Sequence, residues 1–211
     1  MRLFLFVKKM KKIERFVVSA YQTNCYVLYQ NQEALIVDPG ARAERMIASI
    51  DGKQASVSGI VLTHGHLDHI GAVDDLAAHY GCPVYISEAD MPLLTNPRLN
   101  ESAGGREIII KTKPKAIPCG KANIGSFNVE FIDAPGHTAG CVMMLWDQNL
   151  FAGDVLFKGS IGRTDLAAGS NSQMINTLNE IKKMNVDYQV FPGHGDATTL
   201  FEEFAHNPYL N

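Results

Sequence analysis

The sequence predicts an α+β domain built as a four-layer αββα sandwich, with two sheets inside and helices outside. Two sets of elements, each running from strands to a helix and a further strand, favour this arrangement, although no residue-level repeat shows a duplication. The length of 211 residues suits one compact domain, and a composition of 46% hydrophobic and 19% charged residues is typical of a globular protein with a buried core.

The N-terminal segment does not read as a targeting signal. Its apolar run precedes its lysines, which is the reverse of a signal peptide, and the run is too short for a membrane-spanning helix. We therefore expect residues 1–12 to form a disordered N-terminal extension and residues 13–211 to form the single domain. A start site misplaced ahead of Met10 would equally explain residues 1–9.

The first set of elements begins with short apolar and β-branched runs between Ile13 and Val37, which predict a strand meander. Asp38-Pro39-Gly40 ends the meander with turn residues, and helical spacing of apolar residues predicts a helix over 41–50. A buried strand, an amphipathic helix, a strand, a short helix and a mobile, breaker-rich surface loop are expected next, at residues 58–62, 72–80, 84–86, 88–94 and 95–107.

The second set begins near Ile108. It is expected to contain three strands, a helix and a final strand, at residues 127–132, 142–146, 150–152, 173–184 and 188–191. The two sets stacked face to face give the four layers.

Net charge and cysteine content limit the classes of partner and the cellular compartment that we expect. A net charge of -3 provides no basic field for nucleic acid or anionic membranes, so a small-molecule partner is expected. The four cysteines lack CxxC spacing, which favours buried free thiols in a reducing cytoplasm over disulfides. They are Cys25, Cys82, Cys119 and Cys141.

The most informative segment is an HxHxDH pattern that directly follows the predicted strand 58–62. Ligand sites of open α/β sheets lie at the carboxyl ends of strands. Alternate residues leaving a strand point the same way, so His64 and His66 can share one metal ion, while Asp68 and His69 can reach a second.

Three further candidate ligands lie in glycine-flanked turns beside strands: His137, Asp154 and His194. Glycine permits a tight backbone path that directs a short side chain into a crowded centre. Seven ligands are too many for one four-coordinate ion and suit two ions with a bridge. The remaining histidines, His79 and His206, lie in no such turn, and we expect structural contacts for them.

These motifs, with AGDVLF (152–157) and GSIGRTD (159–165), resemble in order and spacing the metallo-β-lactamase superfamily, and within it short glyoxalase II-like (hydroxyacylglutathione hydrolase-like) enzymes. The resemblance runs from about Ile13 to Leu210 and implies the αββα metallo-β-lactamase fold. It implies one ion on His64, His66 and His137, and another on Asp68, His69 and His194. Asp154 would bridge the two ions.

The resemblance implies a hydrolase with two divalent metal ions, zinc or alternatively iron or manganese, that acts on a small-molecule ester or thioester. Asp68 is the expected catalytic residue, because it would orient the attacking water or take its proton. Glyoxalase II enzymes place aromatic residues after the last metal-binding histidine and in the loop after the bridging aspartate, where this chain has Gly195-Asp196 and Thr164-Asp165, so we expect poor recognition of glutathione. The alternatives are a mononuclear iron persulfide dioxygenase, a lactonase or phosphodiesterase, and a non-enzymatic metal-binding module.

Arg163 of the GRTD segment aligns with a cationic substrate-binding position of the glyoxalase II family. Its planar guanidinium could bind a substrate carboxylate. An internal ion pair with Asp165 or another acid, which would brace the loop, is an equal alternative.

Overall fold

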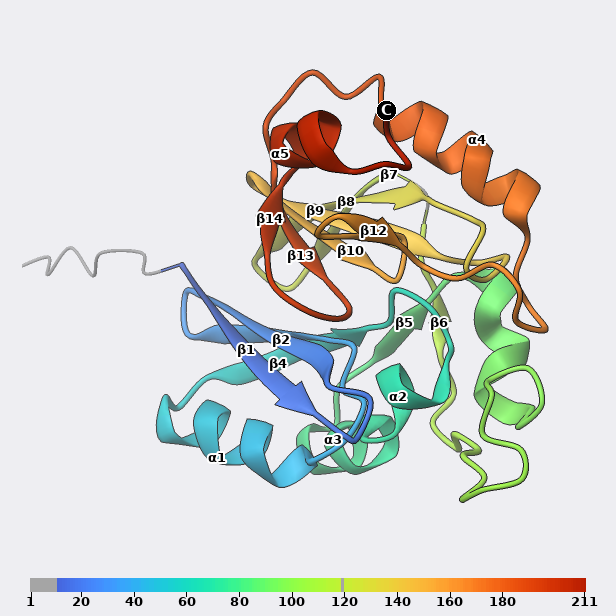
Figure 1. Ribbon diagram of the computed structural model, residues 1–211. Coiled ribbons are helices and arrows are strands. Elements are labelled where there is room, and N and C mark those ends of the chain that lie inside the picture. Colours follow the sequence, from blue (N-terminus) through green and yellow to red (C-terminus); the bar gives the residue numbers. More distant parts are fainter. Residues whose placement is uncertain (1–10, 119) are drawn as a thin grey trace, which may run out of the picture.

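Two six-stranded sheets pack face to face in the computed structural model, which describes residues 11–118 and 120–211 (Figure 1). The expected N-terminal extension lies outside the described residues except for Lys11 and Lys12, and Cys119 lies outside them as well. The first described strand begins at Lys12.

The first sheet has the strand order β1-β2-β3-β4-β5-β6. The first three strands form the predicted antiparallel meander, and the later strands pair in parallel, as crossover connections require. Its strands are β1 (Lys12–Val18), β2 (Thr23–Gln30), β3 (Glu33–Val37), β4 (Ser56–Val61), β5 (Val84–Ile86) and β6 (Lys115–Ala116).

The second sheet has the order β14-β13-β10-β9-β8-β7, and a separate two-stranded hairpin, β11-β12, follows β10. These strands are β7 (Gly120–Ile124), β8 (Phe127–Asp133), β9 (Val142–Trp146), β10 (Asn149–Gly153), β11 (Leu156–Phe157), β12 (Ser160–Ile161), β13 (Gln189–Pro192) and β14 (Thr198–Thr199).

Helices cover the outer faces of both sheets (Figure 1). Helices α1 (Ala43–Gly52) and α3 (Val73–Tyr80) pack against the first sheet. Helices α4 (Asn171–Ile181) and α5 (Leu200–His206) pack against the second. The short helix α2 (Leu67–Ile70) and the 3₁₀ helix η1 (Glu88–Thr95) complete the set in the described residues.

Strand β2 shows why the layers form. Its side chains alternate between the two faces, so Val27 and Tyr29 pack towards α1 and α3 while Tyr26 and Leu28 pack between the sheets. Every residue of β2 is buried, which is expected of a strand with both faces covered. The predicted αββα sandwich is confirmed.

Several features of the fold differ from the sequence prediction, which did not include strands β6, β7, β11, β12 and β14. Helix α5 was not predicted, although Thr199 and Glu202 hold the capping-box positions and the Thr199 hydroxyl accepts the Glu202 amide. The predicted mobile surface loop 95–107 is partly wrong, because Asn100 and Ser102 within it are buried. The Asn100 carbonyl also accepts the Leu67 amide at the start of α2, so the loop is anchored beside the HxHxDH segment.

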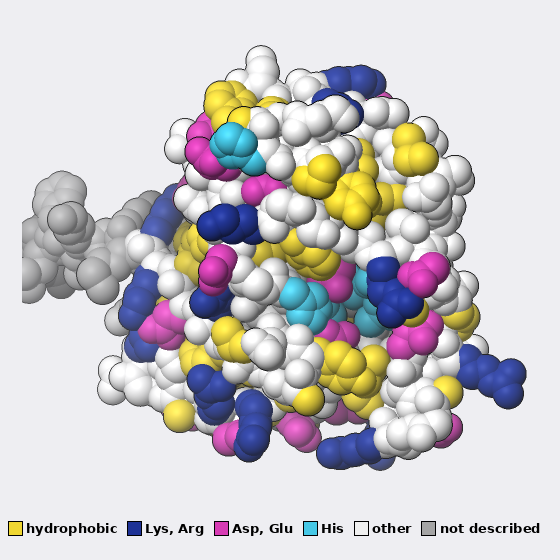
Figure 2. All heavy atoms as spheres, in the orientation of Figure 1, with side chains coloured by type: hydrophobic (Ala, Val, Ile, Leu, Met, Phe, Trp, Pro, Cys, Tyr) yellow, Lys and Arg dark blue, Asp and Glu magenta, His cyan; other side chains and the backbone are white. Residues whose placement is uncertain are grey.

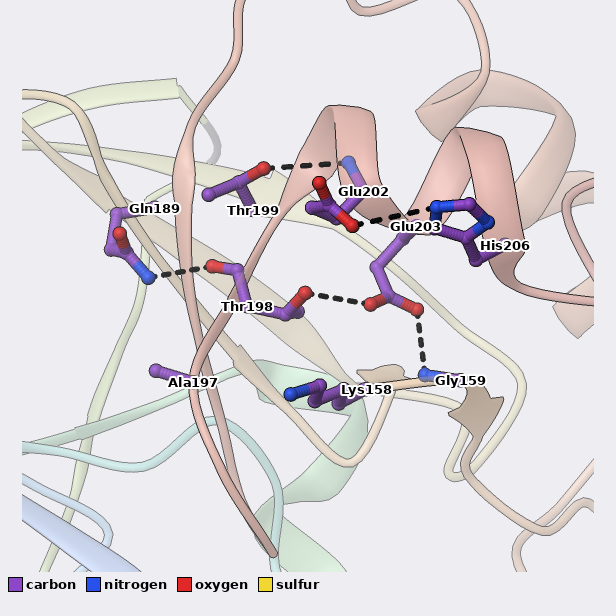
Figure 3. Close-up of a pocket in the computed structure, with 9 residues that line it drawn as sticks. All are labelled: Lys158, Gly159, Gln189, Ala197, Thr198, Thr199, Glu202, Glu203 and His206. Carbon is purple, nitrogen blue, oxygen red and sulfur yellow. Dashed lines mark hydrogen bonds and ion pairs between the residues drawn. The ribbon is translucent and has the colours of Figure 1, made fainter.

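A buried carboxylate ties α5 to the β11-β12 hairpin and to β14. Glu203 is 3% exposed and accepts hydrogen bonds from the Gly159 amide at 2.8 Å, the Thr198 hydroxyl at 2.7 Å and the Asn207 side-chain amide at 2.8 Å. A cavity of about 440 Å³ lies beside this contact, and Figure 3 shows the Glu203 carboxylate between Thr198 and Gly159. The C-terminal helix therefore fixes the hairpin that follows Asp154.

None of the helices in the described part of the chain has the length and apolar character needed to cross a bilayer.

Candidate metal centre

The HxHxDH segment lies where the sequence predicts it, beyond the carboxyl end of β4. His64 and His66 lie in the loop after the strand, and Asp68 and His69 lie in α2. The three imidazoles are at most 3% exposed. Four candidate ligands thus enter one buried volume from a single short segment.

The first ligand group consists of His64, His66 and His137, whose ring nitrogens lie within 4.8 Å of one another. The His66 Nδ1 atom lies 2.8 Å from the His137 Nε2 atom. His137 comes from the turn after β8, in the second sheet. Two buried nitrogens facing each other at this distance suit one shared metal ion.

The second ligand group consists of Asp68, His69 and His194, again within 4.8 Å of one another. The Asp68 Oδ2 atom lies 3.2 Å from His194 Nε2 and 3.5 Å from His69 Nε2. His194 follows β13 and is 29% exposed at its side chain, which makes this group the more accessible one.

Asp154 lies between the two groups. Its Oδ2 atom is 3.5 Å from His137 Nε2 of the first group and 3.3 Å from His194 Nε2 of the second. Its Oδ1 atom is 3.4 Å from His69 Nε2. One carboxylate that reaches both ligand groups is the arrangement a bridging ligand needs.

Four buried polar atoms in the described part of the chain have no hydrogen-bond partner: His64 Nε2, His66 Nε2, His69 Nε2 and Asp154 Oδ1. An unsatisfied buried polar atom is costly, and native structures satisfy most of them. Three of them, on His64, His69 and Asp154, are atoms that a bound cation would satisfy, whereas His66 faces His137 through Nδ1. The structure thus brings all seven predicted ligands together, and metal binding by them stays a prediction.

The surroundings of His64 and His66 in the first group favour neutral imidazoles. Burial, followed by the neighbouring histidines, holds the pKa of His64 well below its usual value. Burial and His137 lower the pKa of His66 to about 3. A neutral imidazole has a lone pair free for a metal ion, so these histidines are ready to bind one.

The second group holds charge. Burial raises the pKa of the Asp154 carboxyl, but His69 and His194 outweigh it and the pKa lies well below its usual value. Burial lowers the pKa of His194, whereas hydrogen bonds to Asp154 and Asp68 raise it to about 9. Carboxylates that hold protons on adjacent imidazoles would exchange those protons for dications.

The two candidate ligand histidines outside the HxHxDH segment, His137 and His194, each have their second ring nitrogen held by the backbone. His137 Nδ1 donates to the Arg163 carbonyl at 2.8 Å, and His194 Nδ1 donates to the Tyr21 carbonyl at 3.1 Å. Fixing Nδ1 in this way directs Nε2 of both rings towards the centre.

Asp38, which the sequence predicts only as part of a turn, orients two candidate ligands. Its Oδ2 atom accepts from His69 Nδ1 at 3.0 Å and from the Thr63 hydroxyl at 2.6 Å. Since the Thr63 hydroxyl donates to Asp38, it accepts from His64 Nδ1, 3.1 Å away. Asp38 therefore orients His69 directly and His64 through the Thr63 hydroxyl.

Asp90 was also missed and joins the two loops that carry the first ligand group. It is fully buried and accepts from the Gly65 amide at 3.0 Å, the Gly140 amide at 2.8 Å and the Thr138 hydroxyl at 2.7 Å. Burial raises the pKa of this carboxyl. Nothing in the local sequence of η1 distinguishes Asp90 from a surface acid.

Glycine is required beside the centre, as the flanking pattern predicts. A Cβ atom on Gly193 would lie 2.1 Å from Asp154 Oδ1 and 2.8 Å from His69 Cε1. Gly153 has a φ of 50°, and a Cβ there would lie 2.4 Å from the Thr63 hydroxyl oxygen. Both positions need the absence of a side chain.

A cavity of about 270 Å³ opens over the ligand groups, and Figure 2 shows histidine side chains within a hollow on this face. Arg163 lines the cavity but already pairs with Asp165, through Nε to Oδ1 at 2.7 Å and Nη2 to Oδ2 at 2.9 Å. The internal ion pair considered from the sequence is therefore present, and substrate binding by Arg163 stays a prediction. His79 and His206 lie outside both ligand groups, each beside an acidic side chain.

Comparison with known proteins agrees with this geometry. The chain is 35% identical to hydroxyacylglutathione hydrolase GloC of Haemophilus influenzae, over 94% of this chain and 98% of the relative. It is similar to the crystal structure of BLEG-1 B3 metallo-beta-lactamase, with 36% identity and a TM-score of 0.90 over 95% of this chain and 100% of the other. It is also similar to TTHA1623, described in a di-iron-bound form, with 29% identity and a TM-score of 0.82 over 93% and 100% of the two chains. The sequence profile of the metallo-beta-lactamase superfamily matches residues 18–194, and the chain belongs to that superfamily.

Proposed function

We propose that this metal-dependent hydrolase binds two divalent metal ions and cleaves thioesters of small acyl groups. The observation that carries the proposal is the position of Asp154, whose carboxylate reaches both ligand groups. The similarity to a relative named hydroxyacylglutathione hydrolase supports the thioester as substrate.

Imidazole and carboxylate ligands suit zinc, iron and manganese. We propose zinc, with iron or manganese as alternatives. The similarity to a protein described in a di-iron-bound form supports a site for two ions and keeps iron in consideration. When bound, two such ions supply a water of lowered pKa and a Lewis acid for the carbonyl oxygen.

The side chains of this protein would direct that water. Asp68 Oδ2 accepts the Thr23 hydroxyl at 2.6 Å, which fixes the carboxylate beside His194. The free lone pairs of Asp68 can then hold the proton of the attacking water. A thiolate leaving group, with a pKa of about 8.5, needs little acid assistance, so the reaction requires no separate proton donor.

A β-lactam is the second candidate substrate, because the chain is 36% identical to a protein described as a B3 metallo-beta-lactamase. Its leaving group is an amide nitrogen, which must be protonated as the bond breaks. Thioester chemistry makes a smaller demand on the site and is the function we favour.

One set of assays separates these functions. Metal-replete protein is given S-D-lactoylglutathione, a simple acyl thioester and the chromogenic cephalosporin nitrocefin, with thiol release or ring opening as the readout. Oxygen uptake with glutathione persulfide tests the mononuclear iron dioxygenase. We expect thiol release to be the fastest reaction. Faster nitrocefin opening or oxygen uptake would replace the proposal.

The setting of the enzyme is part of the same proposal. The described cysteines Cys25, Cys82 and Cys141 are buried free thiols, which supports a reducing cytoplasm. A small-molecule thioester is the proposed partner, with no role for nucleic acid or a membrane surface.

A further inference from the structure

The cavity over the metal centre carries fixed charge on one wall. Apart from the candidate metal ligands, its lining contains two charged side chains, Glu101 and Arg163, among neutral ones such as Tyr21, Leu67 and Leu166. Glu101 comes from the anchored loop 95–107 and Arg163 from the segment after β12. The net charge of this wall would determine whether the acyl or thiol substituent of a substrate is attracted or repelled there.

The positive charge on the wall is already partnered. The Nε–Nη2 edge of Arg163 forms both hydrogen bonds that a carboxylate can make with it, and Asp165 supplies the carboxylate. Asp165, and to a smaller extent Glu101, raise the pKa of Arg163. Two carboxylates therefore act on one guanidinium, and the wall is acidic rather than basic.

Glu101 is held at the cavity by its backbone. The residue has a φ of 64°, a left-handed conformation that is uncommon outside glycine. Asn100 before it is fully buried, and its side-chain amide donates to the Leu93 and Ile108 carbonyls. The buried neighbour stabilises the turn and keeps Glu101 on the wall.

The Glu101 carboxylate retains acceptor capacity. Its Oε1 atom accepts the Ala167 amide at 3.3 Å, a long hydrogen bond that joins the two loops of the wall. A carboxylate has about four lone-pair positions, so most remain for a ligand. The Tyr21 ring, 58% exposed, lines the same cavity and offers a π face of the kind that binds alkylammonium groups.

We propose that Glu101 is a specificity-determining residue that favours thioesters with a positively charged arm and disfavours those with a carboxylate arm. This inference rests on the thioester hydrolysis proposed above and names its substrate class. It differs from the reading of Arg163 as a carboxylate clamp, because Asp165 already occupies that edge of the guanidinium.

The test uses thioesters matched in shape and different in charge. One series varies the thiol: butyryl esters of thiocholine, N-acetylcysteamine and mercaptopropionate. The other varies the acyl group on N-acetylcysteamine: trimethylammoniobutanoyl, pentanoyl and glutaryl. In at least one series we expect kcat/KM to fall about tenfold from the cationic to the anionic member, which combines attraction and repulsion of an exposed charge.

Three variants test whether the cavity wall sets the preference. Glu101→Gln should reduce the ratio to below about threefold, mainly through KM, because the interaction lies away from the reacting atoms. Glu107→Gln makes the same charge change on an exposed position of the same loop and should leave the ratio unchanged. Asp165→Asn frees Arg163 and should raise kcat/KM for the anionic member.

Equal rates within both series for wild-type protein, or faster cleavage of the anionic members, would overturn the inference while leaving thioester hydrolysis intact. A preference that survives Glu101→Gln would overturn it as well. The absence of hydrolysis of all six esters by metal-replete protein would instead overturn the proposed function.

Discussion

His66 and His137 are 71 residues apart in the chain and belong to loops of different sheets, yet their Nδ1 and Nε2 atoms lie 2.8 Å apart in a buried position. Burial lowers the pKa of His66 to about 3, so a proton shared between the rings is disfavoured. A metal ion is the partner that both lone pairs suit.

We therefore expect two metal ions per chain in protein supplied with zinc or iron. Plasma emission spectrometry on protein of measured concentration gives the stoichiometry. His79→Ala, which removes a histidine outside both ligand groups, should keep the same count. A count that stays at one ion after supplementation would favour the mononuclear site.

Asp154→Asn should be the most damaging conservative substitution. A bridging carboxylate would offset the repulsion between two bound dications, and an amide keeps the shape without the charge. Its NH₂ group would direct donors at one ion. We expect loss of at least one ion and a fall in kcat of at least about 100-fold. A variant that keeps two ions and most of its turnover would show that Asp154 does not bridge.

Gly193→Ala should reproduce part of this loss without removing a ligand. The added Cβ would lie 2.1 Å from Asp154 Oδ1, so the carboxylate or the His194 loop must move. A displacement of about 1 Å can cost on the order of 100-fold in rate. Gly52→Ala adds a methyl group at the end of α1 with nothing within 4 Å and serves as the control. Equal turnover of the two variants would remove the steric argument.

Glu203→Gln should destabilise the protein through the C-terminal contact. The substitution removes a buried carboxylate that accepts three hydrogen bonds, and bonds to charged groups contribute about 1.5–3 kcal/mol each. Glutamine keeps one acceptor oxygen, so the net loss is about one such bond, roughly 2 kcal/mol, and the unfolding midpoint should fall by about 5 °C. Glu202→Gln is the control. Glu202 is exposed, with its Oε2 atom 3.7 Å from His206 Nε2, and its substitution should change the unfolding midpoint little. Similar midpoints for both variants would mean that Glu203 is not the tie described here.

Stability should depend on pH through Glu14. Burial raises the pKa of this carboxyl, but hydrogen bonds from Lys12, Ser49 and Lys53 outweigh it and lower the pKa to about 2. A folded pKa below the unfolded value of about 4.3 gives stability that is present above pH 4.3 and is lost as the pH falls towards 2. The difference in unfolding free energy between wild type and Glu14→Gln, from urea titrations, should therefore shrink between pH 6 and pH 3. A difference that grows over this range would contradict the assignment.

The sequence predicts the parts of this protein that follow periodicity or a motif. The strands of the meander, α1, α3 and the sheet layers follow from alternating or helical apolar spacing, and all seven candidate ligands lie where the HxHxDH segment and the glycine-flanked turns indicate. Asp38 and Asp90 could not be found in this way. Their role depends on the three-dimensional approach of loops, Gly65 and Gly140 for Asp90, which sequence spacing does not encode.

Helix α5 marks a second limit. It has seven residues, of which Leu200 and Glu203 are buried, so its apolar pattern is too short to detect. The capping-box residues Thr199 and Glu202 were the available signal. The role of Arg163 was also undecided from the sequence, because a GRTD segment is compatible with both a substrate clamp and an internal ion pair.

Because each ligand group takes residues from both sheets, its members become available at different times during synthesis of the chain. Each ligand group takes two residues from the HxHxDH segment and one from the second half of the chain, His137 or His194. During synthesis, the ribosome therefore releases four ligands well before either group is complete, and the last arrives with His194 near the C-terminus. Neither ligand group is complete before its residue from the second sheet has emerged, so we expect metal loading to require docking of the two sheets.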